Sequence, residues 1–298
     1  MAEALERLRI ADFSRILAGP LATMVLADLG AEVVKVERPG GGDDTRAWGP
    51  PWDERGMATY FESVNRNKRS VALDLRSAPD LERARALIAG ADVLVENFMP
   101  GAMDSFGLGY EQLHAAHPTL VYCSITGFGA REGAKLPGYD LLVQALSGLM
   151  SITGAPAGEP QKVGVALVDV ICGLFAAIGI LAALRHRERS GEGQHVEVDL
   201  LSCALAALVN QASAYTLAGV VAQPMGNAHP SVAPYELLRC ADGMLVLAVG
   251  SDRQFGALAA VLGAPELARP EGGSARLTRN PISLSATPAS YRLAPPAL

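Results

Sequence analysis

The chain has 298 residues, of which 50% are hydrophobic and 19% are charged. This composition is typical of a folded globular protein and excludes disorder over most of the length. The formal net charge of −6 argues against nucleic acid as a partner, because a phosphate backbone attracts proteins with a basic surface.

Over the first two hundred residues, short β-branched runs that predict strands alternate with helical patterns. The strands are expected at 9–13, 32–37, 70–75, 92–97, 120–125 and 195–200. Helices are expected between them at 20–29 and 80–88, the first beginning with proline and each ending before a glycine. Such βα units predict an α/β fold built on a parallel sheet.

Further along the chain, helices are expected at 140–150 and 169–187, helical character continues to Ala218, and a strand is expected at 244–249. Turn-forming residues are frequent between Pro224 and Pro234. We therefore predict a large domain at 1–225 and the start of a smaller domain at 226–269. Residues 270–298 have no sustained period and many Pro and Ser, which predicts an aberrant or disordered tail.

The stretch from Val163 to Leu184 is nearly all apolar and long enough to raise the alternative of a membrane span. Asp169 lies inside it and glycines interrupt it, so a buried helix is the favoured interpretation. The amino terminus has no pattern of a secretory signal, and the four cysteines have no metal-ligand spacing. We expect a cytoplasmic protein without a metal site.

Asp169 lies where a predicted strand turns into a helix, and two interpretations stay open. Its carboxylate is either a helix N-cap that accepts hydrogen bonds from free backbone amides, or a nucleophile. In the second case the same amides would stabilise the oxyanion that develops when the carboxylate attacks a carbonyl group.

Two basic segments precede predicted turns or strands. The run VKVERPGGGDD brings Lys35 and Arg38 to three consecutive glycines, which indicates either an anion-binding loop or a flexible surface loop. The run NRNKRS is interpreted as a solvated charge cluster. The run GFGAREG follows a predicted strand but lacks the helix that a dinucleotide-binding loop needs, so we reject a Rossmann cofactor site.

Taken together, six blocks in the order DFSRILAGPLATMVLADLGAEVVKVERPGGGDDTRAWGPP, VNRNKRSVALDL, DVLVENFMPGAMDSFGLGY, SITGFG, PGYDLLVQALSGLMSITG and VALVDVICGLFAAIGILAALRHRERSGEGQHVEVDLL resemble the class III CoA-transferases over residues 6–265. The resemblance implies a Rossmann-like large domain, a smaller domain that is incomplete here, and an interlocked homodimer. It also implies acyl-CoA and carboxylate substrates, no metal and no permanently bound cofactor.

The same resemblance implies covalent catalysis by Asp169 through an aspartyl-CoA thioester. By position it assigns further residues to the CoA site and its surroundings, namely Ile16, Ala18, Arg38, Ala72, Leu73, Asn97, Phe98, Tyr139 and Asp140. Asn97 and Phe98 also end a predicted strand, which is where ligands bind in open α/β sheets.

Within the family, the chain is most similar to succinyl-CoA:glutarate and related dicarboxylate transferases. Arg15, Arg46 or His229 would then pair with the distal carboxylate of the acid. Arg15 and Leu17 stand where formyl-CoA transferases have histidine and glutamine, which disfavours oxalate. The alternatives are a 2-methylacyl-CoA racemase, for which Tyr139 replaces a required histidine, and a truncated, inactive CoA-binding relative.

Overall fold

The computed structural model describes residues 3–268, in two compact units divided between Pro224 and Met225. The first unit holds a six-stranded sheet, and the second holds a hairpin and a helix. The tail predicted at 270–298 lies outside the described residues.

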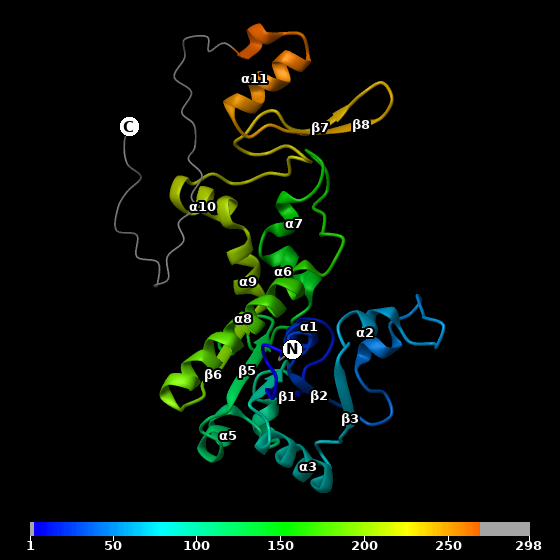
Figure 1. Cartoon of the computed structure of the whole chain (residues 1–298), viewed down its shortest axis with the longest axis vertical. Coiled ribbons are helices and arrows are strands. Elements are labelled where there is room, and N and C mark those ends of the chain that lie inside the picture. The colour runs from blue at the N-terminus through cyan, green and yellow to red at the C-terminus, as the bar shows by residue number, and fades with distance from the viewer. Residues whose placement is uncertain (1–2, 269–298) are drawn as a thin grey trace. The chain divides into compact units, whose positions relative to one another are not determined.

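The sheet of the first unit is entirely parallel, with strand order β3-β2-β1-β4-β5-β6 (Figure 1). Ile10 in the central strand is in register with Val33 on one side and Val93 on the other. The strands are β1 (Arg9–Asp12), β2 (Glu32–Glu37), β3 (Lys68–Ala72), β4 (Val93–Glu96), β5 (Val121–Thr126) and β6 (His195–Asp199). The predicted α/β fold is confirmed.

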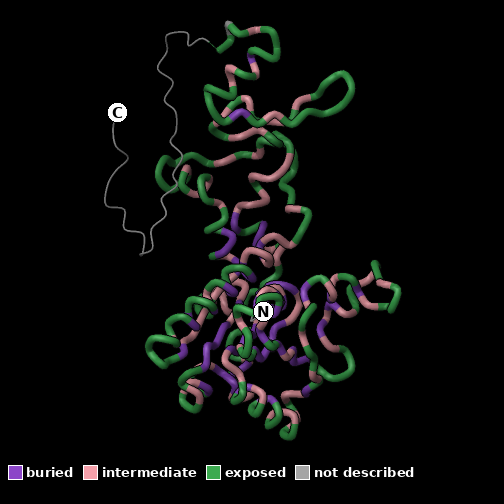
Figure 2. The backbone as a smooth tube through the Cα atoms, in the orientation of Figure 1, coloured by how far each residue is buried: buried purple, intermediate pink, exposed green. Residues whose placement is uncertain are grey.

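Successive side chains in a strand point to opposite faces of a sheet. In the central strands the side chains on both faces are buried, as is usual when helices cover both faces of a parallel sheet. Ile10, Val93 and Val95 belong to the core cluster that includes side chains of α1 and α8. Ala11 and Leu94 belong to the cluster on the other face, with side chains of α3, α4 and α5. Figure 2 shows the buried backbone gathered in the interior of this unit, with exposed segments around it. Five helices flank the central strands. These helices are α1 (Ala18–Asp28), α3 (Ala78–Ala89), α4 (Ala102–Ser105), α5 (Tyr110–Ala116) and α8 (Leu167–Ser190).

Two helix predictions need correction. The helix expected at 140–150 is broken at Gly148, whose φ of 86° ends one helix and starts another. The helix expected from Asp169 begins two residues earlier, at Leu167. The remaining helices of this unit are η1 (Asp44–Ala47), α2 (Thr59–Ser63), α6 (Asp140–Leu146), α7 (Leu149–Ile152), α9 (Leu200–Ala207) and α10 (Val209–Ala218).

Helix α8 is long and apolar enough to cross a membrane. The helices α9 and α10, which are bent by 80° relative to each other, would also be long and apolar enough if the two formed one span. A core helix of a folded domain also meets these criteria. Helix α8 packs closely on α1, because a Cβ added at Gly173 would lie 2.6 Å from the carbonyl oxygen of Ala18. Cys172, Ala176 and Ile180 are fully buried in the core cluster of that face.

The second unit contains β7 (Tyr235–Arg239) and β8 (Met244–Ala248), which form an antiparallel hairpin, followed by α11 (Asp252–Val261) and η2 (Pro265–Ala268). Strand β8 was expected, whereas β7 was not. The sequence YELLR offers neither a β-branched run nor a clean alternation, so its pairing partner defines it as a strand.

The strand order reverses between β1 and β4, and in open parallel sheets ligands bind beyond the carboxyl ends of the strands at this point. The loop after β1 and the loop after β4 are joined here. The side chain of Asn97 accepts a hydrogen bond from the backbone N–H of Arg15 at 2.8 Å and donates one to its carbonyl at 2.7 Å.

Candidate active site

A cavity of about 270 Å³ lies beyond the carboxyl ends of β1, β4 and β5. It is lined by residues of the three following loops and by the first turn of α8. Most of the residues assigned from the sequence meet here, namely Ile16, Ala18, Asn97, Phe98, Tyr139 and Asp169.

Asp169 is not the N-cap of α8, which is Ala166 without a side-chain cap. The cap comes from α6, where one carboxylate oxygen of Asp140 accepts the backbone N–H groups of Val168 at 2.8 Å and Asp169 at 3.1 Å. The Asp169 side chain is therefore not engaged in capping its own helix. Asp140 does not line the cavity, but it contacts the backbone of Asp169, the candidate nucleophile.

The second oxygen of Asp140 accepts a hydrogen bond from the side-chain amide of Gln144, one turn further along α6. Gln144 is fully buried, and its own oxygen accepts the backbone N–H of Val163 at 2.8 Å. This glutamine thus fixes the orientation of the Asp140 carboxylate and the segment that leads into α8. Gln144 was not predicted to be important from the sequence, since its partner Val163 is 19 residues away.

The environment of Asp169 favours its neutral form. Burial is the largest cause and the charge of Asp140 is the second, and together they raise its pKa from 3.8 to about 7. The nearby hydroxyl group of Tyr60 responds to the same field. Its pKa is raised to about 12, first by burial and then by the charges of Asp169 and Asp140. A carboxylate with a pKa near neutrality is more basic and more nucleophilic than a solvated one, and such groups cluster at functional sites.

A second cavity, of about 410 Å³, adjoins the first and shares Arg15 and Phe98 with it. Two more of the assigned residues, Arg38 and Leu73, line it. The Arg38 guanidinium is exposed and forms an ion pair with Asp44. Ala72, the last residue of β3, lies outside the lining of both cavities within the described part of the chain.

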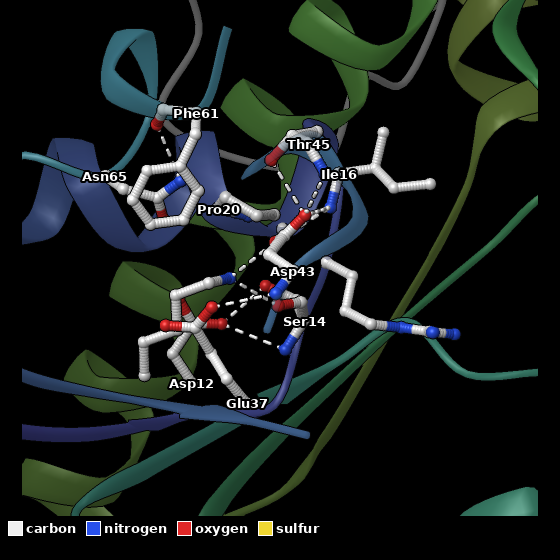
Figure 3. A network of polar contacts seen from close by, with 12 residues as sticks. Asp12, Ser14, Ile16, Pro20, Glu37, Asp43, Thr45, Phe61 and Asn65 are labelled. Carbon is white, nitrogen blue, oxygen red and sulfur yellow. Dashed lines mark hydrogen bonds and ion pairs between the residues drawn. The ribbon is translucent and has the colours of Figure 1, made fainter. Parts of the chain in front are cut away.

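The loop after β1 is anchored by a network of buried charges (Figure 3). Lys35 pairs with Asp43 at 2.9 Å and donates to the carbonyl of Ser14 at 2.8 Å, while Lys68 pairs with Asp12 at 3.1 Å. Burial tends to raise the pKa of Asp12, but the charges of Lys68 and Lys35 and two hydroxyl donors outweigh it and lower that pKa to about 2. Paired charges of this kind are stable in a core only because each has its partner.

This network overturns two interpretations made from the sequence. Lys68 is buried and burial lowers its pKa to about 8, so it is not part of a solvated charge cluster. Lys35 is 1% exposed and pairs with groups in the interior of the protein. Of the two cations in the run VKVERPGGGDD, Arg38 is therefore the one that lines a cavity. Asp12, the partner of Lys68, is 56 residues away in the sequence, where local patterns cannot identify it. Asp43 lies in the same run as Lys35, but on the other side of the three glycines, and the run by itself does not show that the two side chains pair.

The loop from Gly127 to Gly138 also lines the cavity with Asp169, a role that was not predicted from the sequence. It contains the run that was rejected as a dinucleotide-binding loop. Gly127 and Gly138 lie against each other, because a Cβ added at Gly127 would be 2.3 Å from the Cα of Gly138. The loop can fold back on itself at this point only because both residues lack side chains. The two glycines are thus the feature of the sequence from which the close turn of this loop could have been predicted.

Among residues 3–268, no group of three or more His, Cys, Asp or Glu side chains is arranged to hold a metal ion. The chemistry that the described residues offer is that of a carboxylate at the wall of a cavity. A desolvated carboxylate can attack an activated carbonyl group and form a covalent intermediate.

Comparison with known proteins identifies the family. A family model described as CoA-transferase family III matches residues 5–272. The chain is 47% identical over 273 residues to a succinate–glutarate CoA-transferase of Agrobacterium fabrum, covering 90% of this chain and 68% of that protein. It is 46% identical over 264 residues to a succinyl-CoA:glutarate CoA-transferase of Mus musculus, covering 88% of this chain and 60% of that protein.

Solved structures agree with this result. The crystal structure of a CAIB/BAIF family protein from Brucella suis superimposes with a TM-score of 0.81 at 47% identity, covering 91% of this chain and 72% of that one. The chain thus spans 60 to 68% of the length of the two CoA-transferases named above. On the match to the family model and on these identities, the chain belongs to CoA-transferase family III.

Proposed function

We propose that the protein transfers coenzyme A from an acyl-CoA donor, succinyl-CoA, to a dicarboxylic acid acceptor such as glutarate. The observation that carries the proposal is Asp169, a carboxylate with a pKa raised to about 7 that lines a cavity with Ile16, Asn97 and Phe98. Two relatives that are 46–47% identical to the chain are named for succinate or succinyl-CoA and glutarate.

The reaction begins when the Asp169 carboxylate attacks the carbonyl carbon of the acyl-CoA. The carbon–sulfur bond breaks, CoA leaves as a thiolate, and a mixed anhydride joins Asp169 to the acyl group. The thiolate then attacks the aspartyl carbonyl carbon of the anhydride. The donor acid leaves as its carboxylate, and Asp169 holds CoA as a thioester.

The second half repeats these steps with the acceptor. The acceptor carboxylate attacks the aspartyl thioester, which releases the CoA thiolate and forms a second anhydride. The thiolate attacks the acceptor side of this anhydride, so that a new acyl-CoA leaves and the Asp169 carboxylate is regenerated. Neither half of the reaction requires a metal or a redox cofactor, because every bond that breaks is matched by one that forms. CoA thioesters take part only as substrates and products.

The two adjoining cavities provide a path for the long CoA molecule. The thioester end would lie in the cavity with Asp169 and Tyr139, and the nucleotide end in the cavity with Arg38 and Leu73. Arg38 is exposed there and can meet a phosphate group. Ala72 is assigned to the CoA site by family position only.

We further propose that the protein acts in the cytoplasm, that it forms an interlocked homodimer if its C-terminal part is complete, and that it uses neither a membrane nor nucleic acid. Large apolar side chains remain exposed on α8 of the described chain, namely Leu174, Phe175 and Ile178. Surfaces of this kind usually contact another protein chain. The packing of α8 on α1 supports its role as a core helix, and the net charge of −6 disfavours nucleic acid.

The proposal is tested by intact-protein mass spectrometry after incubation with succinyl-CoA, for the wild-type chain and for Asp169→Ala. We expect a CoA-sized adduct on the wild type, none on the variant, and loss of the adduct when glutarate is added. A folded wild-type chain that forms no adduct would instead support an inactive CoA-binding relative. An adduct that persists in Asp169→Ala would assign the nucleophile to another residue.

A further inference from the structure

Arg15 is the one cation among the residues that line the Asp169 cavity in the described part of the chain. Asp169 is the one acidic residue of the same lining. A dicarboxylic acid that binds here brings a second carboxylate into the cavity, close to the carboxylate of Asp169. Burial of a carboxylate is costly unless a cation or several donors meet it, so Arg15 decides whether such a substrate can bind.

The guanidinium group of Arg15 has N–H groups that are free to bind a ligand. Its Nε is buried and has no hydrogen-bond partner among the described residues. Its Nη1 lies 3.6 Å from a carboxylate oxygen of Asp44, a long contact, and the side chain is 39% exposed. The group lies over the ring of Phe98 at 5.1 Å, which orients its plane. A buried donor without a partner is costly, and a ligand oxygen would remove this cost.

The backbone that carries Arg15 is held in a fixed position. Asn97 binds both its N–H and its carbonyl group, at 2.8 and 2.7 Å. The next residue, Ile16, has a φ of 71°, a strained conformation for a β-branched side chain. Its N–H points to the buried carboxylate of Asp43 at 3.2 Å (Figure 3), which in turn pairs with Lys35. Strain that the surroundings maintain at such a loop is typical of ligand-binding sites.

Arg46, another cation of the first unit that was considered from the sequence, is less suitable. It donates to both oxygens of Glu37 at 2.7 Å and stacks on Phe61 at 3.7 Å, so its charge is already paired. Arg46 also does not line the cavity of Asp169.

We infer that Arg15 binds the distal carboxylate of the dicarboxylic acid and thereby determines the specificity for dicarboxylates over monocarboxylates. This inference rests on the proposed transferase function. When Asp169 is converted to the CoA thioester its negative charge is gone, and Arg15 is then the dominant charge of the cavity. It attracts an acceptor with two carboxylates, and its planar group orients the distal one so that the other reaches the thioester.

The test measures the discharge of the aspartyl-CoA enzyme by two acceptors of equal length, glutarate and pentanoate. Enzyme loaded with succinyl-CoA is freed of donor, mixed with either acid, and followed by mass spectrometry. For Arg15→Met, which removes the charge and keeps the stem, we expect about a 10- to 100-fold loss of kcat/KM for glutarate. The value for pentanoate should stay the same or rise.

Two further variants complete the design. Arg15→Lys keeps the charge but loses the planar donors, so its preference for glutarate should lie between those of the wild type and Arg15→Met. Arg185→Met removes an exposed arginine that pairs with Glu188 near the end of α8 and should leave the ratio unchanged. Thermal unfolding of each variant checks that it is folded.

The inference fails if loaded Arg15→Met keeps the wild-type ratio of glutarate to pentanoate. If, in that case, titration with free CoA also shows weakened binding by Arg15→Met, Arg15 binds the CoA nucleotide instead of the acid. Failure of the proposed function gives a different result, since the wild-type chain would not form the adduct at all.

Discussion

The carboxylate of Asp140 accepts the backbone N–H of Asp169 at 3.1 Å and that of the preceding residue at 2.8 Å. One helix thus caps another, and the cap places a negative charge beside the side chain that we assign as the nucleophile. The amides at the start of α8 that would otherwise favour a carboxylate there are already occupied. Proximity of the two acids, together with burial, accounts for the raised pKa of Asp169.

The substitution Asp140→Asn keeps an oxygen that can accept the backbone amides but removes the charge. Because that charge is the second cause of the raised pKa of Asp169, the pKa should fall, yet stay above 3.8 since burial remains. The rate of adduct formation with succinyl-CoA in a single turnover should rise with pH through a midpoint near 7 in the wild type. The midpoint of Asp140→Asn should be lower, and coincident profiles would rule out the electrostatic role of Asp140.

The substitution Asp169→Asn should stabilise the fold, and more so at higher pH. Between the unfolded pKa of 3.8 and the folded value of about 7, the folded wild type keeps a proton that the unfolded chain has lost. The free energy of unfolding of the wild type therefore falls as the pH rises through this window, and a neutral amide removes the effect. Calorimetry should give a larger gain in Tm for the variant at pH 8 than at pH 4.5. An equal gain at both values would contradict the raised pKa.

The substitution Lys68→Met should destabilise the protein by about 3–5 kcal/mol, because it leaves the buried carboxylate of Asp12 without one of its cations. Arg69→Met, at the next residue of β3, is the matched control. That arginine is exposed and pairs with an exposed Glu32, so its loss should cost less than about 1 kcal/mol. Urea denaturation measures both, and similar losses for the two variants would mean that burial of the Lys68 pair is unimportant.

The substitution Gly127→Ala should impair adduct formation far more than it impairs folding. The new methyl group would lie 2.3 Å from the Cα of Gly138, so the loop that lines the cavity has to move. A displacement of about 1 Å at a catalytic site can reduce a rate about 100-fold. Gly243→Ala is the control, since a Cβ there meets no atom within 4 Å. Unchanged adduct formation by a folded Gly127→Ala would show that the loop does not shape the site.

The six strands and the helices α1, α3 and α8 could be predicted because each is defined by local periodicity, and β2 was predicted at its observed bounds. The short helices α4 and α5 were not predicted. Asp169, Asn97 and Phe98 could be assigned because resemblance and strand ends agree. The charged network and the cap on α8 could not be predicted. Lys68 and Asp12 are 56 residues apart, and Asp140 and Asp169 are 29 apart. Such pairs depend on which strands and helices become neighbours, and local sequence does not encode this directly.

The position of β6 at the edge of the sheet has a consequence for synthesis of the chain. Its only partner strand in the described sheet is β5, and Ser124 in β5 and His195 in β6 are 71 residues apart in sequence. While the ribosome makes the long α8, the run VYCSIT of β5 has one free edge of backbone donors and acceptors. An apolar, uncharged strand edge readily pairs with another chain, so the interval before β6 emerges is the period of greatest risk of aggregation.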